Sequence, residues 1–150
     1  MYKRILVPVD GSETAKRGLA EALQLTKALD ANLKIVHIVD DSALALNPET
    51  GIAAAPLVAD FAEGGKQILE QARAQARAAG IEAELVLHEN FTGRVAELIA
   101  DEAKKWGADL IVMGTHARAG VKHALLGSSA ESVVHASPVP VLLVRTAPSK

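Results

Sequence analysis

Two glycine-containing turns hold the residues whose types and spacing could bind a charged ligand. The first turn, Val9-Asp10-Gly11-Ser12, directly follows a short apolar run that ends at Pro8. The Asp10 carboxylate could accept hydrogen bonds from a base or from a ribose hydroxyl group, and Gly11 permits a tight turn into the next segment. The alternative is that Asp10 only stabilises the turn before a helix, as aspartate often does.

The second turn ends in Gly127-Ser128-Ser129, just before a segment with helical spacing. The N-terminus of a helix offers unpaired N–H groups and the positive end of its dipole, so it binds anions such as phosphate. Arg118 and Lys122 precede this turn and could neutralise phosphate charge. The alternative is that Gly114 and Gly127 are ordinary turn residues and that Ser128 is an ordinary N-cap.

Other sequence patterns for catalysis are absent. The chain has no P-loop pattern, no Gly-x-Gly-x-x-Gly and no His-Glu-x-x-His. Its five histidines do not form a ligand pattern for a metal ion. Among them, only His116 is expected beside the ligand, whereas His37 is expected to have a structural role. Because the chain also lacks an obvious general base, no catalytic residue is assigned.

Five short runs predict the strands that must position both turns. The runs are Arg4–Val9, Leu33–Val39, Glu82–His88, Leu110–Met113 and Val139–Val144. Four of them are nearly continuously apolar, as in strands covered on both faces, and the third alternates polar and apolar residues like an edge strand. Strands that alternate with helices predict a doubly wound α/β fold, with a parallel sheet and helices on both faces. Ligands of such sheets bind at the carboxyl ends of the strands, where both turns lie.

Helical spacing predicts four helices between the strands. They extend from Ala15 to Thr26 after an N-cap at Ser12, from Phe61 to Ala76 before Gly80, from Val95 to Trp106 between Thr92 and Gly107, and from Ser128 to Ala136. Ser128 precedes Glu131 by three residues, which is the spacing of a capping box. The stretch Asp40–Leu57 is expected to be a long flexible loop, either a functional lid or a surface excursion.

Composition narrows the classes of protein to which the chain could belong. The chain has 150 residues, a formal net charge of −2 and no cysteine. No run of Lys and Arg exceeds two residues, so no nucleic-acid partner is expected. No apolar run approaches the roughly 20 residues that span a bilayer. The first apolar run is too short for a signal peptide, and a cytoplasmic protein without membrane insertion is therefore expected.

Five blocks of sequence, in order, resemble the universal stress protein family over essentially the whole chain. The blocks are Lys3–Ser12, Val36–Val39, Ala108–His116, Leu125–Val134 and Pro138–Arg145. The ATP-binding branch of that family carries Gly-x2-Gly-x9-Gly-Ser/Thr. Here the pattern is Gly114, Ala117, Gly127 and Ser128, so Ala117 replaces one glycine. If that position requires a positive φ, alanine costs on the order of 1 kcal/mol.

The resemblance implies a single universal stress protein domain over residues 1–150, with a Rossmann-like fold of the adenine-nucleotide alpha-hydrolase type and strand order 3-2-1-4-5. It implies ATP as the ligand, accompanied by Mg²⁺ or Mn²⁺. The implied contacts are Pro8, Val9 and Asp10 around the adenosine, Ile38 against the base, Met113 and Gly114 at the ribose, Ala117 and Arg118 at the phosphates, and Gly127, Ser128 and Ser129 capping the phosphates. A homodimer through the strand Val139–Val144 is also implied, because this strand would otherwise be an exposed sheet edge.

Three functions remain open at this stage. The leading hypothesis is a homodimeric, ATP-binding regulator of a stress response, which acts on an unidentified protein partner. The second is a dimerisation module of the same family whose pocket no longer holds a nucleotide because of Ala117. The third is a slow ATPase or phosphotransferase, for which at most weak hydrolysis is expected because the chain lacks a P-loop lysine.

Overall fold

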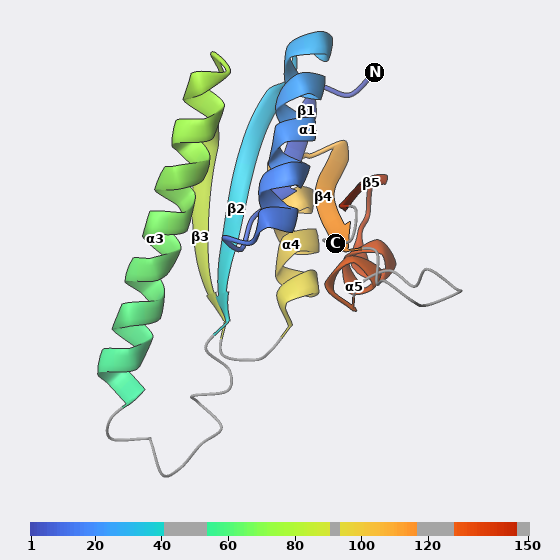
Figure 1. Ribbon diagram of the computed structural model, residues 1–150. Helices are drawn as coiled ribbons and strands as arrows, with labels where there is room; N and C mark the ends of the chain where they lie inside the picture. The colour runs from blue at the N-terminus through green and yellow to red at the C-terminus, as the bar shows by residue number, and fades with distance from the viewer. Residues whose placement is uncertain (41–53, 91–93, 117–127, 147–150) are drawn as a thin grey trace.

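A parallel five-stranded sheet forms the centre of the molecule. The computed structural model describes residues 1–40, 54–90, 94–116 and 128–146 (Figure 1). The strands are β1 (Arg4–Pro8), β2 (Asn32–Asp40), β3 (Glu84–Asn90), β4 (Leu110–His116) and β5 (Val141–Thr146). They lie in the order β3-β2-β1-β4-β5, and each neighbouring pair is parallel. The expected strand order is therefore confirmed, with the alternating strand β3 at one edge and β5 at the other.

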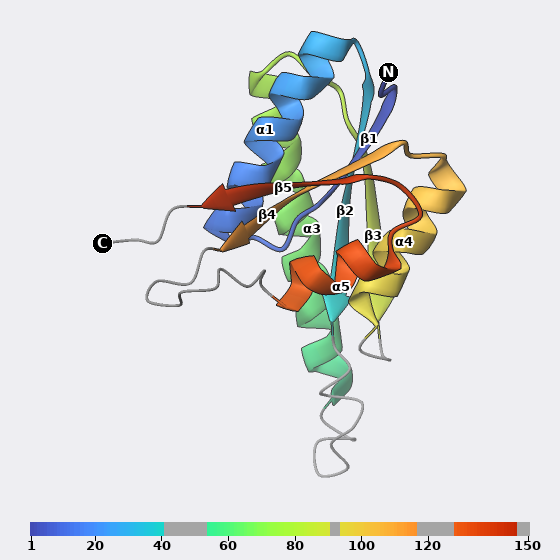
Figure 2. The ribbon, with the colours of Figure 1, turned by 90° about the vertical axis from the view of Figure 1, so that its right-hand side faces the viewer.

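Helices cover both faces of this sheet. They are α1 (Glu13–Leu29), α3 (Ala54–Ala78), α4 (Val95–Trp106) and α5 (Ser128–Ala136). Buried residues of α1 and α3 pack against one face, and those of α4 and α5 pack against the other. Figure 2 shows α1 and α4 on opposite sides of the strands. The expected doubly wound arrangement is confirmed.

Alternate residues along the strands form two separate aliphatic cores. Ile5 and Val7 of β1 belong to the core under α1 and α3, whereas Leu6 belongs to the core under α4 and α5. All three side chains are fully buried. A strand covered on both faces needs apolar residues at every central position, which explains the continuous apolar run in this part of the sequence.

Local capping groups fix where the helices begin and end. Ser12 is the N-cap of α1, and its Oγ accepts a hydrogen bond from the Ala15 N–H at 3.1 Å, as the sequence predicts. Gly107 ends α4 with φ 78°, and its N–H donates to the carbonyl oxygens of Ala103 and Lys104. The Gly107 cap turns the chain toward β4.

Several boundaries differ from the sequence prediction. The helix α3 begins at Ala54 rather than near Phe61, and β2 continues through Asp40, so both ends of the expected loop Asp40–Leu57 belong to regular elements. Pro56 is compatible with this start, because a proline in the first helical turn gives up no intrahelical hydrogen bond. Residues 41–53, the remainder of that loop, lie outside the described residues. The strand β3 lies two residues further along the chain than predicted, and β4 is three residues longer.

Two predicted helix caps fall on or beside segments that are not described. The N-cap of α4 is Arg94, without a side-chain hydrogen bond, and Thr92 is outside the described residues. The helix α5 extends over Ser128–Ala136 as predicted. Ser128 is the first described residue of this helix and its side chain is not described, so the predicted capping box stays a prediction.

Candidate functional site

A pocket of about 1000 Å³ opens at the carboxyl edge of the sheet, between the ends of β1 and β4. The strand order reverses here, because β2 and β3 lie on one side of β1 while β4 and β5 lie on the other. This is the place where open α/β sheets bind ligands. The pocket is lined by these residues of the expected site: Pro8, Val9, Asp10, Ile38, Met113, Gly114 and Ser129.

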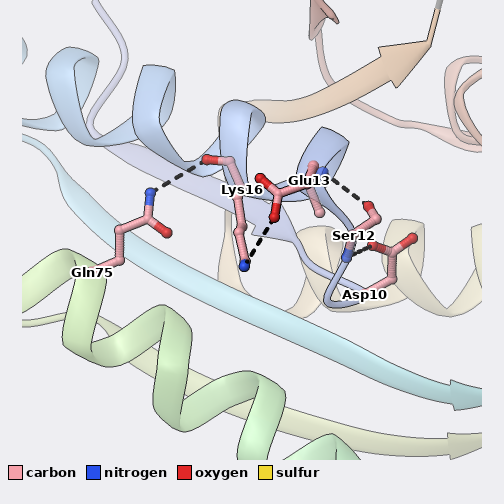
Figure 3. A network of polar contacts seen from close by, with 6 residues as sticks. Asp10, Ser12, Glu13, Lys16 and Gln75 are labelled. Carbon is pink, nitrogen blue, oxygen red and sulfur yellow. Dashed lines mark hydrogen bonds and ion pairs between the residues drawn. The ribbon is translucent and has the colours of Figure 1, made fainter. Parts of the chain in front are cut away.

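The turn after β1 brings a carboxylate to the rim of this pocket. Gly11 has φ 84°, which only glycine adopts without strain, and so the chain reverses directly into α1. The Asp10 Oδ1 accepts a hydrogen bond from the Ser12 N–H at 2.9 Å (Figure 3). Asp10 therefore stabilises the turn and is also exposed at the pocket. Its predicted contact with a ribose or base stays a prediction.

Gly114 lies where α1 crosses the end of β4. A Cβ atom at this position would overlap the carbonyl group of Thr14, and a Cβ atom at Gly18 would lie 2.6 Å from the Gly114 N. Two glycines are thus needed to let the helix contact the strand backbone. Gly114 also lines the pocket, as expected, but the steric need for glycine comes from α1.

The floor of the pocket is apolar, and one part of its rim is polar. Val36, Ile38 and Met113 are buried and form part of the floor. Ser129 and Ser132 of α5 line the pocket and are exposed. An apolar floor with a few polar groups at its rim is typical of pockets that hold a ring system together with a polar substituent.

The first turn of α5 borders the pocket at Ser129. The N-terminus of this helix supplies partial positive charge and N–H donors toward the adjoining space. Ala117, Arg118, Lys122 and Gly127 are outside the described residues, and the side chain of Ser128, like that of His116, is not described.

The sequence prediction missed the contribution of α4. Arg94, Val95, Ala96 and Glu97, at the start of this helix, line the pocket. The Arg94 Nη1 lies 3.5 Å from the Glu97 Oε2, and both side chains are exposed. The signal was present in the predicted topology, because every helix that follows a parallel strand begins at the carboxyl edge. Arg94 is therefore a cation of this pocket that the sequence did not single out.

His37 has a structural contact, as expected. The Nδ1 of this buried side chain lies 2.7 Å from the Val9 carbonyl oxygen. Since a carbonyl oxygen only accepts, the imidazole carries its proton on Nδ1.

In the part of the chain that is described, no cluster of three His, Asp or Glu side chains could hold a metal ion. No helix within that part has the length and apolar character needed to cross a membrane.

Comparison with known proteins identifies the family of the chain. Residues 1–145 match the universal stress protein family. The chain belongs to this family. One universal stress protein, from Thermus aquaticus, is 40% identical over 97% of this chain and 100% of its own length. The solved structure of the universal stress protein MJ0577 from Methanocaldococcus jannaschii has a TM-score of 0.80, with 28% identity over 99% of each chain.

Two further universal stress proteins have been solved with nucleotides. One is in complex with cAMP, is 26% identical and has a TM-score of 0.64, with 97% of this chain and 98% of that chain covered. The other, from Archaeoglobus fulgidus, is in complex with dAMP, is 25% identical and has a TM-score of 0.65, with 95% and 98% covered. Relatives of this universal stress protein thus bind adenine nucleotides.

Proposed function

We propose that this universal stress protein binds ATP at the carboxyl edge of its sheet and acts in the cytoplasm as a homodimeric regulator of a stress response. The observation that carries the proposal is the pocket itself, which joins the Asp10 turn, the end of β4 and the first turn of α5. Its volume of about 1000 Å³ is sufficient for a nucleotide, because small-molecule pockets occupy about 300–1,000 Å³. The nucleotide-bound relatives give the ligand class.

The backbone of Ile38 is suited to contact the adenine base. In a parallel ladder both polar groups of a residue face one neighbouring strand, and successive residues alternate between neighbours. Val36 faces β1, since its carbonyl oxygen accepts from the Val9 N–H at 2.9 Å. Ile38 lies two residues further along β2, so its N–H and C=O groups point to the same side as those of Val36. On that side β1 has already ended at Pro8. An N–H and a C=O on one residue complement the N1 acceptor and N6 donor of adenine.

The other end of the pocket provides positive potential for the triphosphate. The N–H groups at the start of α5 favour an anion near Ser129. Arg94 of α4 also lines the pocket, and a bound triphosphate would compete with Glu97 for its guanidinium group. Arg118 and Ala117 belong to the same proposed end by resemblance to the family pattern. The phosphates themselves would hold Mg²⁺ or Mn²⁺, because no protein cluster among the described side chains is built for a metal ion.

The variant Ser129→Asp tests the phosphate end of the pocket. An acidic residue in the first turn of a helix favours the helix, so α5 should still form, but its charge would repel the phosphates. In thermal unfolding with Mg²⁺, ATP at 100 times its Kd should stabilise the wild-type protein by about 2.7 kcal/mol. ATP should stabilise the Ser129→Asp variant far less than it stabilises the wild-type protein. The control Ser129→Asn introduces a side chain of the same size without the charge, so ATP should stabilise it almost as much as the wild-type protein. Adenosine, which has no phosphates, should bind all three proteins alike.

The same experiment distinguishes the alternatives. Equal stabilisation of the Asp and Asn variants by ATP would contradict the phosphate position. Absence of any released nucleotide after heat denaturation, together with no stabilisation of the wild-type protein by ATP, would favour the dimerisation module with an empty pocket. Steady formation of ADP by the wild-type protein that Arg118→Ala abolishes would favour the slow ATPase.

A further inference from the structure

The ladder between β1 and β2 stops one hydrogen bond early. Its register ends at Pro8 and Val36, although the Val9 N–H still donates to the Val36 carbonyl oxygen at 2.9 Å. The next regular bond would run from the Ile38 N–H back to the Val9 carbonyl oxygen and would extend β1 by one residue. Val9 is not part of the strand, and no such bond joins these two described residues.

The side chain of His37 occupies the acceptor that this missing bond would use. Its Nδ1 donates to the Val9 carbonyl oxygen at 2.7 Å. The imidazole is 8% exposed, and it packs between β2 and α3. Gly65 of α3 makes room for it, because a Cβ atom there would lie 2.9 Å from the His37 Cδ2. The imidazole is therefore enclosed by its surroundings and aimed at one backbone oxygen.

We infer that His37 is a positioning residue, which satisfies the Val9 carbonyl oxygen and so keeps the Ile38 N–H available to a bound base. Val9 is 7% exposed, and a buried carbonyl group without a donor is costly. Without the imidazole, the Ile38 N–H is the backbone donor that a regular parallel ladder would pair with this oxygen. Pairing these two groups would close the ends of β1 and β2 and occupy the donor that faces the pocket. The functional meaning of this inference rests on the proposed nucleotide site.

Amide hydrogen exchange of the nucleotide-free protein tests the inference without any ligand. In the wild-type protein the Ile38 amide should exchange much faster than the Val36 amide on the same strand, because only Val36 is paired with β1. In His37→Leu, which removes the donor but keeps an apolar side chain, the Ile38 amide should become protected by about tenfold or more. The ATP affinity of this variant should fall about tenfold, as expected for one lost hydrogen bond.

Two further variants separate positioning from packing. In His37→Asn the amide nitrogen can take the place of the imidazole Nδ1, so wild-type exchange at Ile38 and most of the ATP affinity should return. Leu87→Ala loosens the same contact with Gly65, since the Leu87 Cδ1 also lies beside it, but leaves the donor to Val9 in place. This control should lower the melting temperature without protecting the Ile38 amide.

The exchange data decide the inference independently of nucleotide binding. A protected Ile38 amide in the wild-type protein, which requires no variant to fold, would overturn it. Unchanged exchange at Ile38 in a folded His37→Leu variant would also overturn it. Failure of ATP to bind the wild-type protein overturns the proposed function instead, and the exchange of the Ile38 amide can still be measured in that case.

Discussion

Gly114 illustrates how one absent side chain determines the geometry of the candidate site. The carbonyl group of Thr14 occupies the space where a Cβ atom of residue 114 would lie, and Gly18 removes the corresponding obstacle on the helix. The close contact brings the start of α1 against the end of β4, and both elements line the pocket. A larger residue would have to push the helix and the strand apart.

Gly114→Ala should therefore destabilise the protein. Forcing one methyl group into a packed contact costs about 1–3 kcal/mol, and here the obstacle is backbone that cannot rotate away. Urea denaturation should show this loss in the free energy of unfolding. The matched control is Gly64→Ala in α3, where no atom of another described element lies within 4 Å of the added Cβ and alanine favours the helix by about 0.5–1 kcal/mol. A Gly114→Ala variant as stable as the wild-type protein would contradict the steric explanation.

The sequence predicted several residues that line the pocket, but it did not predict every reason for their identity. Asp10 and Ser129 could be predicted because turn and capping patterns are local in the sequence. The steric role of Gly114 could not be predicted, since it depends on where α1 crosses a strand about a hundred residues away in the chain. Arg94 was missed although the predicted topology indicated it, because the helix after β3, like every helix that follows a parallel strand, begins at the carboxyl edge.

At the scale of elements, a buried ion pair attaches α4 to the sheet. The Glu102 Oε1 of α4 lies 2.6 Å from the Lys34 Nζ of β2, and its Oε2 lies 3.0 Å from the His88 Nε2 of β3. Glu84 of β3 also faces Lys34, at 3.9 Å. Helical spacing marked only the apolar residues of α4, so the burial of Glu102, which is 7% exposed, could not be predicted from it. A buried carboxylate of this kind requires partners from other elements, which become visible only in the fold.

The Glu102 contacts make the stability of the protein depend on pH. Burial raises the pKa of Glu102, but hydrogen bonds from Lys34 and His88 outweigh it, and the pKa is lowered from its ordinary value of 4.5. A lowered pKa in the folded state stabilises the fold above pH 4.5, and this contribution is lost as the pH falls through the folded-state pKa.

Glu102→Gln should reveal this contribution directly. At pH 7 the variant should be less stable by up to about 3 kcal/mol, because the largely buried Lys34 loses its nearest counter-charge and keeps only the Glu84 carboxylate at 3.9 Å. The difference from the wild-type protein should shrink once the pH falls below 4.5, where the carboxylate becomes protonated. Urea denaturation over a pH series measures both effects. The control Glu97→Gln removes an exposed ion pair of the same helix and should change stability by less than about 1 kcal/mol at every pH. A constant difference between the Glu102→Gln and wild-type proteins across the series would contradict the ion-pair explanation.

At the scale of the whole molecule, the two edges of the sheet differ in how they meet solvent. At the β3 edge, Glu84 and His88 extend toward a buried ion pair, whereas β5 carries Leu142, which is 39% exposed. The polar alternation of β3 predicted one edge strand, whereas the edge position of β5 and its pairing with a second copy of the chain were implied by the resemblance to the family. A second copy of the chain is the proposed cover, because an unpaired apolar edge promotes association.

Leu143→Pro tests the proposed dimer without breaking the sheet. The Ile111 N–H donates to the Pro140 carbonyl oxygen at 3.0 Å, so alternation along β5 directs the N–H of Leu142 toward β4 and that of Leu143 outward. Proline at position 143 would therefore remove a donor that only a partner strand uses, and proline is tolerated at such edge positions. Sedimentation should show a dimer for the wild-type protein and a folded monomer for Leu143→Pro. Leu143→Ala shortens the same side chain but keeps the N–H, so it should remain dimeric. A Leu143→Pro variant that is folded and still dimeric would show that the subunits associate through another surface.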